Sequence, residues 1–284
     1  MNKYILIGHP LGHSMSPMIH ERLFAIKGRD ADYSLVEITP EELPLKADFL
    51  RQFKGFNITI PHKQNIIPLL DEMGDSALRY NSVNCVVNDG GKLIGYNTDC
   101  DGFLRSVEKY PMDGKVLLIG CGGVGRMMAI EAARSGADLT IGIIPCDKER
   151  AAALTDEIHT IKPDAKIKIA LTSDLDESFD VILNASPVGM YPKTDACPVS
   201  DPLIEKCGHV FDVIYNPIET TLMKKARALG KTAIGGSAML VLQAVKAHEL
   251  WDNDLYTDEQ INEIIKAMEE QISKQFPVNG GDSQ

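Results

Sequence analysis

The chain has 284 residues, of which 44% are hydrophobic and 24% are charged. This length is typical of two domains, and the composition is that of a globular protein, which excludes the disordered and fibrous classes. Forty acidic residues against 29 basic ones give a formal net charge of -11. We expect no nucleic-acid partner, because phosphate backbones attract basic surfaces and repel acidic ones. An anionic small molecule can still bind where the charge is locally positive.

The cysteines and the N-terminus indicate the compartment. Six cysteines, at positions 85, 100, 121, 146, 197 and 207, form no CxxC pair and no Cys/His cluster with zinc spacing. We expect free thiols in a reducing cytoplasm and no metal site. His9 and Pro10 interrupt the first apolar run before it resembles a signal peptide. No stretch approaches the roughly 20 apolar residues of a membrane span, so we predict a cytoplasmic protein without a membrane partner.

The first hundred residues alternate strand-like and helix-like segments. Apolar or alternating runs predict strands at 4–7, 33–38, 55–60, 83–87 and 92–96. Asn88-Asp89-Gly90-Gly91 between the last two indicates a hairpin. Ser16 is expected to cap a helix that has Pro17 in its first turn and ends at Gly28. Thr39, followed by acidic residues, predicts the start of another helix.

The middle of the chain has a different pattern. Apolar runs separated by helical patterns predict strands at 115–119, 138–144, 167–170, 181–183 and 210–214. A fully apolar strand such as 115–119 is typical of a parallel sheet, so this rhythm predicts a doubly wound α/β domain. From Ser237 the pattern is helical, and a capping signal at Thr257 opens a last helix that extends to Gln275.

A glycine loop follows the strand at 115–119. Residues 120–125 read Gly-Cys-Gly-Gly-Val-Gly and fit G-x-G-x-x-G, with an apolar strand before them and a helix after them. In such loops the glycines permit a tight turn, a close approach of pyrophosphate and close helix–strand packing, and the helix N-terminus stabilises the anion. We therefore predict a dinucleotide site at Gly120, Gly122, Gly123, Val124 and Gly125.

The residues after the second strand of this domain bear on the choice of cofactor. An acid there accepts the ribose hydroxyls of NAD, whereas an arginine favours the phosphate of NADP. This chain has Ile144-Pro145-Cys146-Asp147, with Lys148 and Arg150 beyond. Asp147 either binds the ribose or acts as a cap or first-turn acid of the next helix. Of NAD and NADP, the sequence favours NAD; NADP would require Lys148 or Arg150 to hold the phosphate.

Small polar residues gather at the ends of elements in the first domain. Ser14 and Ser16 flank a predicted helix N-terminus, which suits a carboxylate, although Ser16 also has the plainer reading of a cap. Asn57 and Thr59 lie on one face of a strand, and Lys63 emerges after it. Taken singly, a lysine at such an edge is usually a solvated charge.

Together these residues lie in motifs that resemble the shikimate dehydrogenase family. The motifs follow the family's order at residues 8–10, 13–17, 57–63, 81–84, 95–102, 120–125, 184–190, 212–217 and 239–243. The resemblance implies an N-terminal α/β substrate domain at 1–100 and a Rossmann-like doubly wound dinucleotide-binding domain at 101–236. It also implies that C-terminal helices, 237–284, pack back on the first domain and complete it.

The resemblance also implies a reaction and a site. That family reduces 3-dehydroshikimate to shikimate, reversibly, with a nicotinamide cofactor, in aromatic amino acid biosynthesis. Carried over by motif, Lys63 and Asp99 would be the catalytic pair. The substrate would be bound by Ser14, Ser16, Asn57, Thr59, Asn84, Tyr215 and Gln243. The cofactor would be bound by the glycine loop, Asp147, Ser186 and the Gly236 backbone.

This chain also departs from the family's pattern. The NADP-using members carry Asn-Arg-Thr after the second Rossmann strand, and this chain does not. An NAD-dependent quinate/shikimate dehydrogenase is therefore an alternative, although Ser16 in place of threonine favours shikimate over quinate. Two other alternative functions are those of a non-catalytic nucleotide-binding regulator and of a dehydrogenase of the methylene-tetrahydrofolate type. The expected partner is a small-molecule substrate, and the protein is expected to be a monomer or a homodimer.

Overall fold

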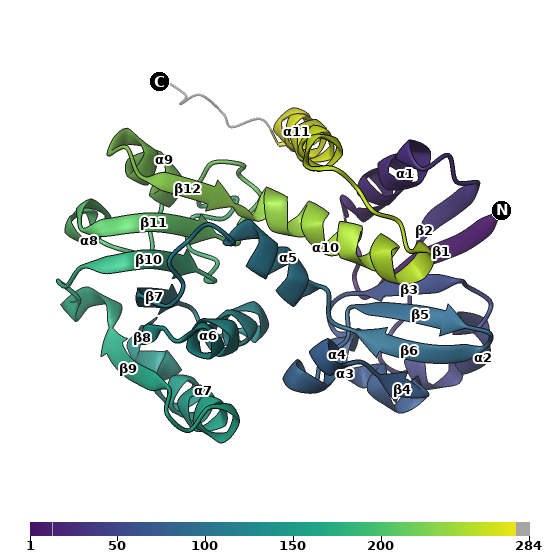
Figure 1. Ribbon diagram of the computed structural model, residues 1–284, viewed down its shortest axis with the longest axis horizontal. Helices are drawn as coiled ribbons and strands as arrows, with labels where there is room; N and C mark the ends of the chain where they lie inside the picture. The colour runs from purple at the N-terminus through teal and green to yellow at the C-terminus, as the bar shows by residue number, and fades with distance from the viewer. Residues whose placement is uncertain (13, 277–284) are drawn as a thin grey trace. The chain divides into compact units, whose positions relative to one another are not determined.

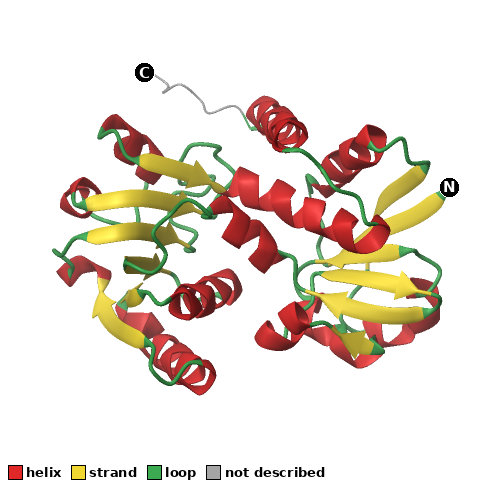
Figure 2. Ribbon diagram, viewed as in Figure 1, coloured by secondary structure: helices red, strands yellow, loops and turns green. Residues whose placement is uncertain are grey.

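The computed structural model describes residues 1–12 and 14–276 (Figure 1). The chain divides into two compact units. Unit 1 comprises Met1–Gly102 and Leu240–Met268, and unit 2 comprises Phe103–Met239 with the described residues from Glu269. Each unit holds one six-stranded sheet with helices, so the predicted α/β class is confirmed (Figure 2). The predicted division into 1–100, 101–236 and 237–284 concerns where substrate and cofactor bind, and it remains a prediction.

The sheet of unit 1 is mixed and has the order β2-β1-β3-β5-β6-β4. Its strands are β1 (Asn2–Gly8), β2 (Ala31–Glu37), β3 (Gly55–Ile58), β4 (Glu72–Met73), β5 (Cys85–Asp89) and β6 (Lys92–Tyr96). β1 pairs in parallel with β2 and β3, and β5 is antiparallel to β3 and β6. The helices within this unit are α1 (Ser16–Ile26), α2 (Ala47–Leu50), α3 (His62–Asn65) and α4 (Asp75–Tyr80), with short 3-10 turns at Leu43–Leu45 and Ile67–Leu69.

Alternation along β1 sends its side chains into two cores. Ile5 and Ile7 join the core that contains Leu50 of α2. Tyr4 and Leu6 point to the other face, as the two-residue period of a strand requires. On that face lie Phe24 of α1 and Trp251 of α10 (Gly236–Asp252). Helices from opposite ends of the chain therefore cover one face of this sheet.

Trp251 fixes α10 to the first sheet. Its indole nitrogen donates to the Val86 carbonyl of β5 at 2.9 Å. A Cβ atom at Gly55 would lie 2.3 Å from the same nitrogen, so only glycine fits at the start of β3. This close approach brings the late helix onto strands formed by the first hundred residues.

The sheet of unit 2 is parallel throughout, in the order β12-β11-β10-β7-β8-β9. Its strands are β7 (Lys115–Ile119), β8 (Asp138–Ile143), β9 (Lys166–Leu171), β10 (Phe179–Asn184), β11 (Cys207–Asp212) and β12 (Thr232–Gly235). This is the Rossmann order, and the direction of winding reverses between β7 and β10. The predicted doubly wound domain is thereby confirmed.

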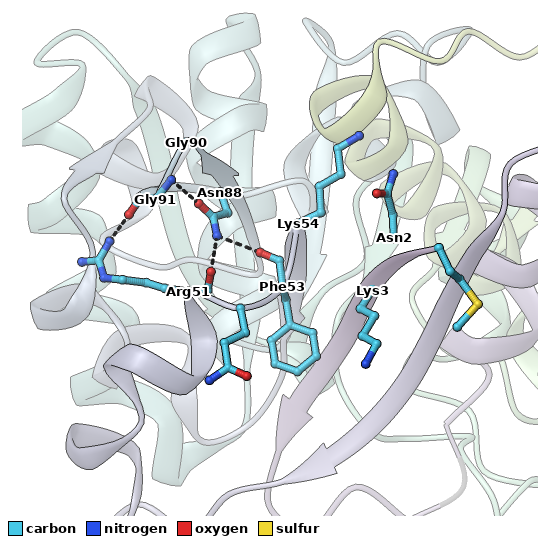
Figure 3. Close-up of a pocket in the computed structure, with 10 residues that line it drawn as sticks. Asn2, Lys3, Arg51, Phe53, Lys54, Asn88, Gly90 and Gly91 are labelled. Atoms are coloured by element: carbon cyan, nitrogen blue, oxygen red, sulfur yellow. Dashed lines mark hydrogen bonds between the residues drawn. The ribbon is translucent and has the colours of Figure 1, made fainter.

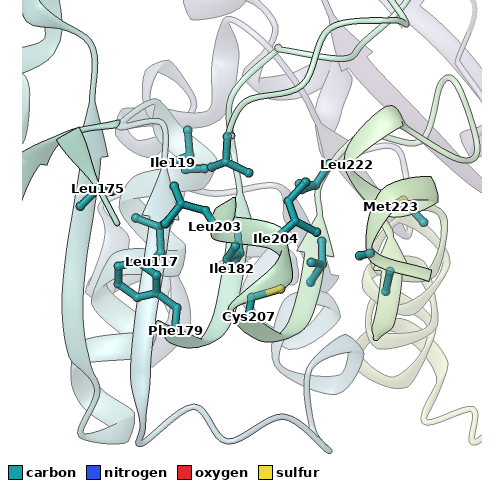
Figure 4. Close-up of a cluster of buried hydrophobic side chains, with 14 residues drawn as sticks. Leu117, Ile119, Leu175, Phe179, Ile182, Leu203, Ile204, Cys207, Leu222 and Met223 are labelled. Atoms are coloured by element: carbon teal, nitrogen blue, oxygen red, sulfur yellow. The ribbon is translucent and has the colours of Figure 1, made fainter. Parts of the chain in front are cut away.

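Helices enclose the second sheet. They are α6 (Gly123–Ser135), α7 (Lys148–Ile161), α8 (Asp201–Glu205) and α9 (Thr221–Ala228), with 3-10 turns at Pro145–Asp147 and Thr172–Asp174. In one of its cores, Leu117 of β7 and Ile182 of β10 pack with Leu203 of α8 and Leu222 of α9 (Figure 4). Three helices each extend across a boundary between the units: α5 (Asp99–Ser106), α10 and α11 (Asp258–Gln275).

Local predictions differ from the structure at two helix starts. Ser16 lies inside α1 and does not cap it; the Ser14 hydroxyl instead accepts the Ser16 N–H at 3.2 Å. No helix begins at Thr39: Thr39 and Glu42 exchange hydrogen bonds, but only a 3-10 turn and the single turn of α2 follow. Pro44 stands at this point and has no N–H to continue an α-helical ladder.

One further local prediction is confirmed: Thr257 and Gln260 form the expected capping box before α11.

All six cysteines are free thiols in the structure. In the described part of the chain, no helix is both long and apolar enough to cross a membrane.

Two buried histidines meet between α1 and α10. His20 Nδ1 lies 3.0 Å from His248 Nε2, and His248 Nδ1 lies 3.0 Å from the Tyr256 hydroxyl. The Tyr256 hydroxyl also donates to the Leu23 carbonyl at 3.1 Å. These contacts fit two neutral rings, with His248 donating to Tyr256 and His20 donating to His248. Burial lowers the pKa of both rings, that of His248 to about 3.

This pair makes unit 1 sensitive to acid. Because both pKa values are lower in the folded state than the ordinary 6.5, the unfolded chain binds protons first as the pH falls. The pair's contribution to stability is complete above about pH 6.5 and declines below it. We expect the urea midpoint, followed by Trp251 fluorescence, to be lower at about pH 5.5 than at about pH 7.5, and to fall less in His248→Phe.

A histidine of unit 2 provides the control. His159 lies on α7, so His159→Gln should show the same fall in urea midpoint as the unmodified chain. An equal fall in His248→Phe and the unmodified chain would contradict the assignment of acid sensitivity to this pair.

Candidate active site

A network of buried polar side chains lies in unit 1, centred on Asn84 just before β5. Asn84 is only 3% exposed. Its Nδ2 lies within hydrogen-bond distance of three acceptors: Asp99 Oδ1 at 2.9 Å, Thr98 Oγ1 at 3.1 Å and Gln243 Oε1 at 3.4 Å. Its Oδ1 accepts the Thr98 N–H at 2.7 Å. The amide therefore joins the start of β5, the start of α5 and the middle of α10.

Lys63 and Asp99 form an ion pair beside this network. Lys63 Nζ lies 2.6 Å from Asp99 Oδ2, while the other carboxylate oxygen faces Asn84. Pro61 precedes α3, which begins at His62 and presents Lys63, and Asp99 is the first residue of α5. The two side chains are 29% and 19% exposed, so both remain accessible to a small molecule. A cation fixed by a carboxylate in this way can stabilise an oxyanion and deliver a proton to it.

Ser14, Ser16 and Thr59 are partly exposed in the same unit. The two serines lie at the N-terminus of α1, and His13 before them lies outside the described residues. Thr59 follows β3, and a Cβ at Gly8 would lie 2.5 Å from its methyl carbon, so glycine at this position makes room for Thr59. Hydroxyls and a helix N-terminus suit an anion.

Asn57 differs from these residues because it is buried. The Tyr33 hydroxyl donates to Asn57 Oδ1 at 2.8 Å, and Asn57 Nδ2 donates to the Asn84 carbonyl at 3.1 Å. Tyr33 and Thr98 were not singled out from the sequence, although both are buried within this network. Thr98 belongs to the motif at 95–102, whereas the only signal for Tyr33 was its place in the alternation of β2.

The glycine loop of unit 2 has the predicted geometry. Gly120 follows β7 with a φ of +97°, and Gly122 precedes α6. A Cβ at Gly125 would lie 2.0 Å from the Gly120 carbonyl oxygen, so α6 packs closely on the loop. Gly122 and Gly123 are exposed, and a Cβ at either would meet no atom within 4 Å. This open space at a helix N-terminus fits a pyrophosphate.

A second loop follows β10 at the point where the winding reverses. Ser186 donates its N–H and its hydroxyl to Asn184 Oδ1, at 3.1 and 2.7 Å. Asn184 Nδ2 donates to Asp212 Oδ1 at 3.0 Å, and the Thr220 hydroxyl donates to Asp212 Oδ2 at 2.8 Å. Burial raises the pKa of Asp212 to about 6. The network fixes Ser186 at the edge where ligands of open α/β sheets bind.

Tyr215 and Gly236 also lie in unit 2. The Gly236 N–H donates to the Ile214 carbonyl at 3.0 Å, and a Cβ at Gly236 would lie 1.9 Å from the Val213 oxygen. Tyr215 is 40% exposed, and burial of its hydroxyl raises its pKa. The structure thus joins five of the predicted residues by polar contacts, namely Asn57, Lys63, Asn84, Asp99 and Gln243. Among the described residues, no hydrogen bond or ion pair joins Ser14, Ser16 or Thr59 directly to these five, and Tyr215 and Gly236 belong to the other unit.

Asp147 is held in an ion pair. It lies in the 3-10 turn before α7, and its Oδ1 is 3.1 Å from Arg150 Nη1. Lys148 and Arg150 are both exposed beside it. Among the described residues, no group of three or more His, Cys, Asp or Glu side chains is placed to hold a metal ion.

A separate pocket of about 550 Å³ lies in unit 1 at the other end of β3 (Figure 3). Asn88 shapes it by donating to the Arg51 and Phe53 carbonyls at 2.7 and 2.8 Å. Arg51 is ion-paired with Asp71, and Lys54 with Asp252. Lys54 precedes β3 and Thr59 follows it, so this pocket is separate from the Lys63–Asp99 pair.

Comparison with known proteins identifies the family. Residues 6–86 match the model of the shikimate dehydrogenase substrate binding domain. A shikimate dehydrogenase (NADP(+)) of Methanococcus maripaludis strain C6 is 38% identical over 87% of this chain and 90% of the relative. Another, from Halothermothrix orenii, is 38% identical over 95% and 96%. The chain belongs to the shikimate dehydrogenase family.

Solved structures of this family share the fold. A shikimate dehydrogenase in complex with NADP+ has a TM-score of 0.84 and 34% identity, covering 94% of this chain and 95% of that one. The Thermus thermophilus enzyme in complex with NADP(H) and shikimate has a TM-score of 0.82 and 28% identity, with 94% and 100% covered. The predicted membership of the shikimate dehydrogenase family is confirmed.

The preference for NAD is wrong. The relatives from the two organisms above are named as NADP(+) enzymes, and one similar structure holds NADP+. The prediction rested on Asp147 as a free acceptor for the ribose hydroxyls. In the structure that carboxylate is paired with Arg150, and Lys148 adds a second positive charge, so the turn is not the anionic site that the sequence suggested.

The glycine loop gives a direct structural test. Gly125→Ala should lower the melting temperature, because its Cβ would overlap the Gly120 oxygen and push α6 from the loop, which costs about 1–3 kcal/mol. Gly122→Ala is the matched control: its φ of -70° suits alanine and its Cβ would meet open space. Circular dichroism melts measure both, and equal losses would contradict the packing role of Gly125.

Proposed function

We propose that this protein is a shikimate dehydrogenase that interconverts 3-dehydroshikimate and shikimate with NADP, in aromatic amino acid biosynthesis. The observation that carries the proposal is the Lys63–Asp99 ion pair, at 2.6 Å, held by the buried Asn84 amide. It supplies acid–base chemistry among hydroxyl and amide groups that suit a polyhydroxylated carboxylate. The Rossmann fold of unit 2 and its glycine loop supply the means to bind a dinucleotide.

Unit 1 is proposed to bind the substrate. Ser14 and Ser16, at the N-terminus of α1, hold its carboxylate, because their hydroxyls and the free helix N–H groups are donors for an anion. Thr59, Asn84 and Gln243 hydrogen-bond its ring hydroxyls. A role of Tyr215 in substrate binding stays a prediction from the resemblance; its side chain is 40% exposed.

Lys63 and Asp99 carry the proton chemistry. Bound NADPH supplies the hydride that reduces the ketone carbon of 3-dehydroshikimate. Lys63 stabilises the negative charge that develops on the ketone oxygen and delivers the proton that makes it a hydroxyl. Asp99 orients the lysine through one oxygen and is itself oriented by Asn84 through the other. In the oxidation direction, the same pair accepts the proton.

Unit 2 is proposed to bind NADP. The exposed Gly122 and Gly123 at the N-terminus of α6 admit the pyrophosphate, with Gly120, Val124 and Gly125 shaping the loop. Ser186 and the Gly236 backbone would contact the nicotinamide half of the cofactor. Lys148 and Arg150 hold the 2′-phosphate, in place of the Asn-Arg-Thr residues of other members. Asp147 keeps Arg150 in position beside them.

The function is tested by initial rates of shikimate oxidation with NADP+, with quinate as a comparison substrate. We expect turnover of shikimate, and we expect Lys63→Ala to lower it by roughly a hundred- to ten-thousandfold, the range of positioned acid–base catalysis. The dissociation constant of NADP+, measured by calorimetry, should not change in that variant.

Lys92→Ala is the matched control, because Lys92 forms an exposed ion pair with Glu72 in the same sheet. It should retain full turnover. Near-normal turnover in Lys63→Ala would remove the catalytic role of Lys63. An unmodified protein with no turnover of shikimate would overturn the enzyme assignment and leave the non-catalytic alternative.

The phosphate site is tested by binding. Replacement of Lys148 and Arg150 by alanine should weaken NADP+ binding about tenfold for each lost charged hydrogen bond. Binding of NAD+ should change little, because it lacks the 2′-phosphate. Lys162→Ala, beyond the other end of α7, is the control. Equal weakening of NAD+ and NADP+ binding would contradict this site.

A further inference from the structure

A buried tyrosine contacts the polar network of the proposed substrate site. Tyr33 of β2 is 5% exposed, and its ring stacks on that of His20, with centroids 4.1 Å apart and planes 8° apart. Its hydroxyl donates to Asn57 Oδ1 at 2.8 Å. Burial raises the pKa of Tyr33, so the hydroxyl stays protonated and remains a donor to Asn57.

Hydrogen bonds of the Asn57 side chain connect Tyr33 to Asn84. With its oxygen facing Tyr33, the Asn57 amide directs its nitrogen at the Asn84 carbonyl, 3.1 Å away. That carbonyl also accepts the Ile58 N–H at 2.9 Å, so two donors fix the Asn84 peptide. The Asn84 side chain then holds Asp99 at 2.9 Å, and Asp99 holds Lys63 at 2.6 Å. A continuous chain of polar contacts thus connects Tyr33 to the Lys63–Asp99 pair.

We propose that Tyr33 is a positioning residue of the substrate site, whose hydroxyl orients the Lys63–Asp99 pair through Asn57 and Asn84. The proposal rests on the function proposed above. It also gives Asn57 a positioning role: the residue is buried, and both ends of its amide are already hydrogen-bonded within the protein. Tyr33 does not touch the reacting atoms, so its effect must pass through these residues.

The geometry explains why the hydroxyl matters. Without it, Asn57 Oδ1 lacks the donor that sets the orientation of the amide, and the amide is free to turn. An Asn57 oxygen facing the Asn84 carbonyl would repel it and shift the peptide that carries the Asn84 side chain. Small displacements of catalytic groups cost about a hundredfold in rate when they spoil the alignment of the reacting atoms.

Tyr33→Phe tests the proposal, because it removes the hydroxyl and keeps the ring that stacks on His20. We expect kcat/KM for shikimate to fall by roughly ten- to a hundredfold, with kcat reduced and the dissociation constant of NADP+ unchanged. Tyr110→Phe is the matched control: Tyr110 is a buried tyrosine of unit 2 whose hydroxyl donates to the Val210 carbonyl at 3.0 Å. A merely structural role would lower the melting temperature in both variants and leave kcat unchanged in both.

A double-mutant cycle with Asn57→Ala tests the coupling itself. If Tyr33 acts through Asn57, the double variant should lose less than the product of the two single losses in kcat/KM. A loss equal to that product would overturn the coupling. Should Tyr33→Phe fail to fold, Asn57→Ala interrupts the same path one residue later, and an unchanged kcat in that variant would overturn the proposal.

The outcomes separate this inference from the proposed function. An unmodified protein that does not oxidise shikimate overturns the proposed function and this inference with it. An active unmodified protein whose Tyr33→Phe variant matches Tyr110→Phe in kcat and kcat/KM overturns the positioning role of Tyr33 alone.

Discussion

The hydrogen bonds of the Asn84 side chain organise the candidate active site. One buried amide contacts the neighbouring residues Thr98 and Asp99 and also Gln243, which lies far along the sequence in α10. A buried amide left without partners is costly, so these contacts favour one arrangement of the segments that carry them. The position of Asp99, and through it that of Lys63, is therefore set by the interior of unit 1. Both side chains can stay partly exposed without losing their alignment.

In unit 2, two glycines allow close backbone packing because they have no side chain. Gly125 lets α6 approach the Gly120 carbonyl, and Gly236 lets α10 begin against the Val213 carbonyl. Both contacts lie at the carboxyl edge of the parallel sheet, near the reversal of winding between β7 and β10. Hydrogen bonds among Asn184, Asp212 and Thr220 fix the loop that follows β10. One unit thus aligns its site by polar contacts, and the other by close backbone packing.

Much of this could be predicted from the sequence, because the signals were local. The glycine loop, five of the six strands of the parallel sheet and the capping box at Thr257 each lie within a few residues, and the structure has all of them. The sixth strand, β12, was not predicted. The fold class and family were equally accessible from ordered motifs. The helix expected at Thr39 failed for a local reason too, since Pro44 interrupts it.

What could not be predicted depends on contacts between distant segments. Tyr33 meets Asn57 only because β1 lies between β2 and β3 in one register, with Tyr4 opposite Tyr33 and Leu6 opposite Asn57. No spacing in the sequence reveals that neighbourhood. The prediction for Asp147 was wrong because its carboxylate forms an ion pair with Arg150 and is less available to a ribose. That ion pair depends on the turn before α7.

The division of the chain also bears on its synthesis. Unit 1 needs Leu240–Met268, whereas most of unit 2 is the single stretch Phe103–Met239. On a ribosome, the strands of unit 1 emerge first but lack α10, with Trp251 and Gln243, until nearly the whole chain has been made. The face of that sheet around Tyr4 and Leu6 is uncovered during this interval, and such apolar faces attract chaperones or other nascent chains. Unit 2 can therefore fold while unit 1 still lacks the part of α10 that covers its sheet.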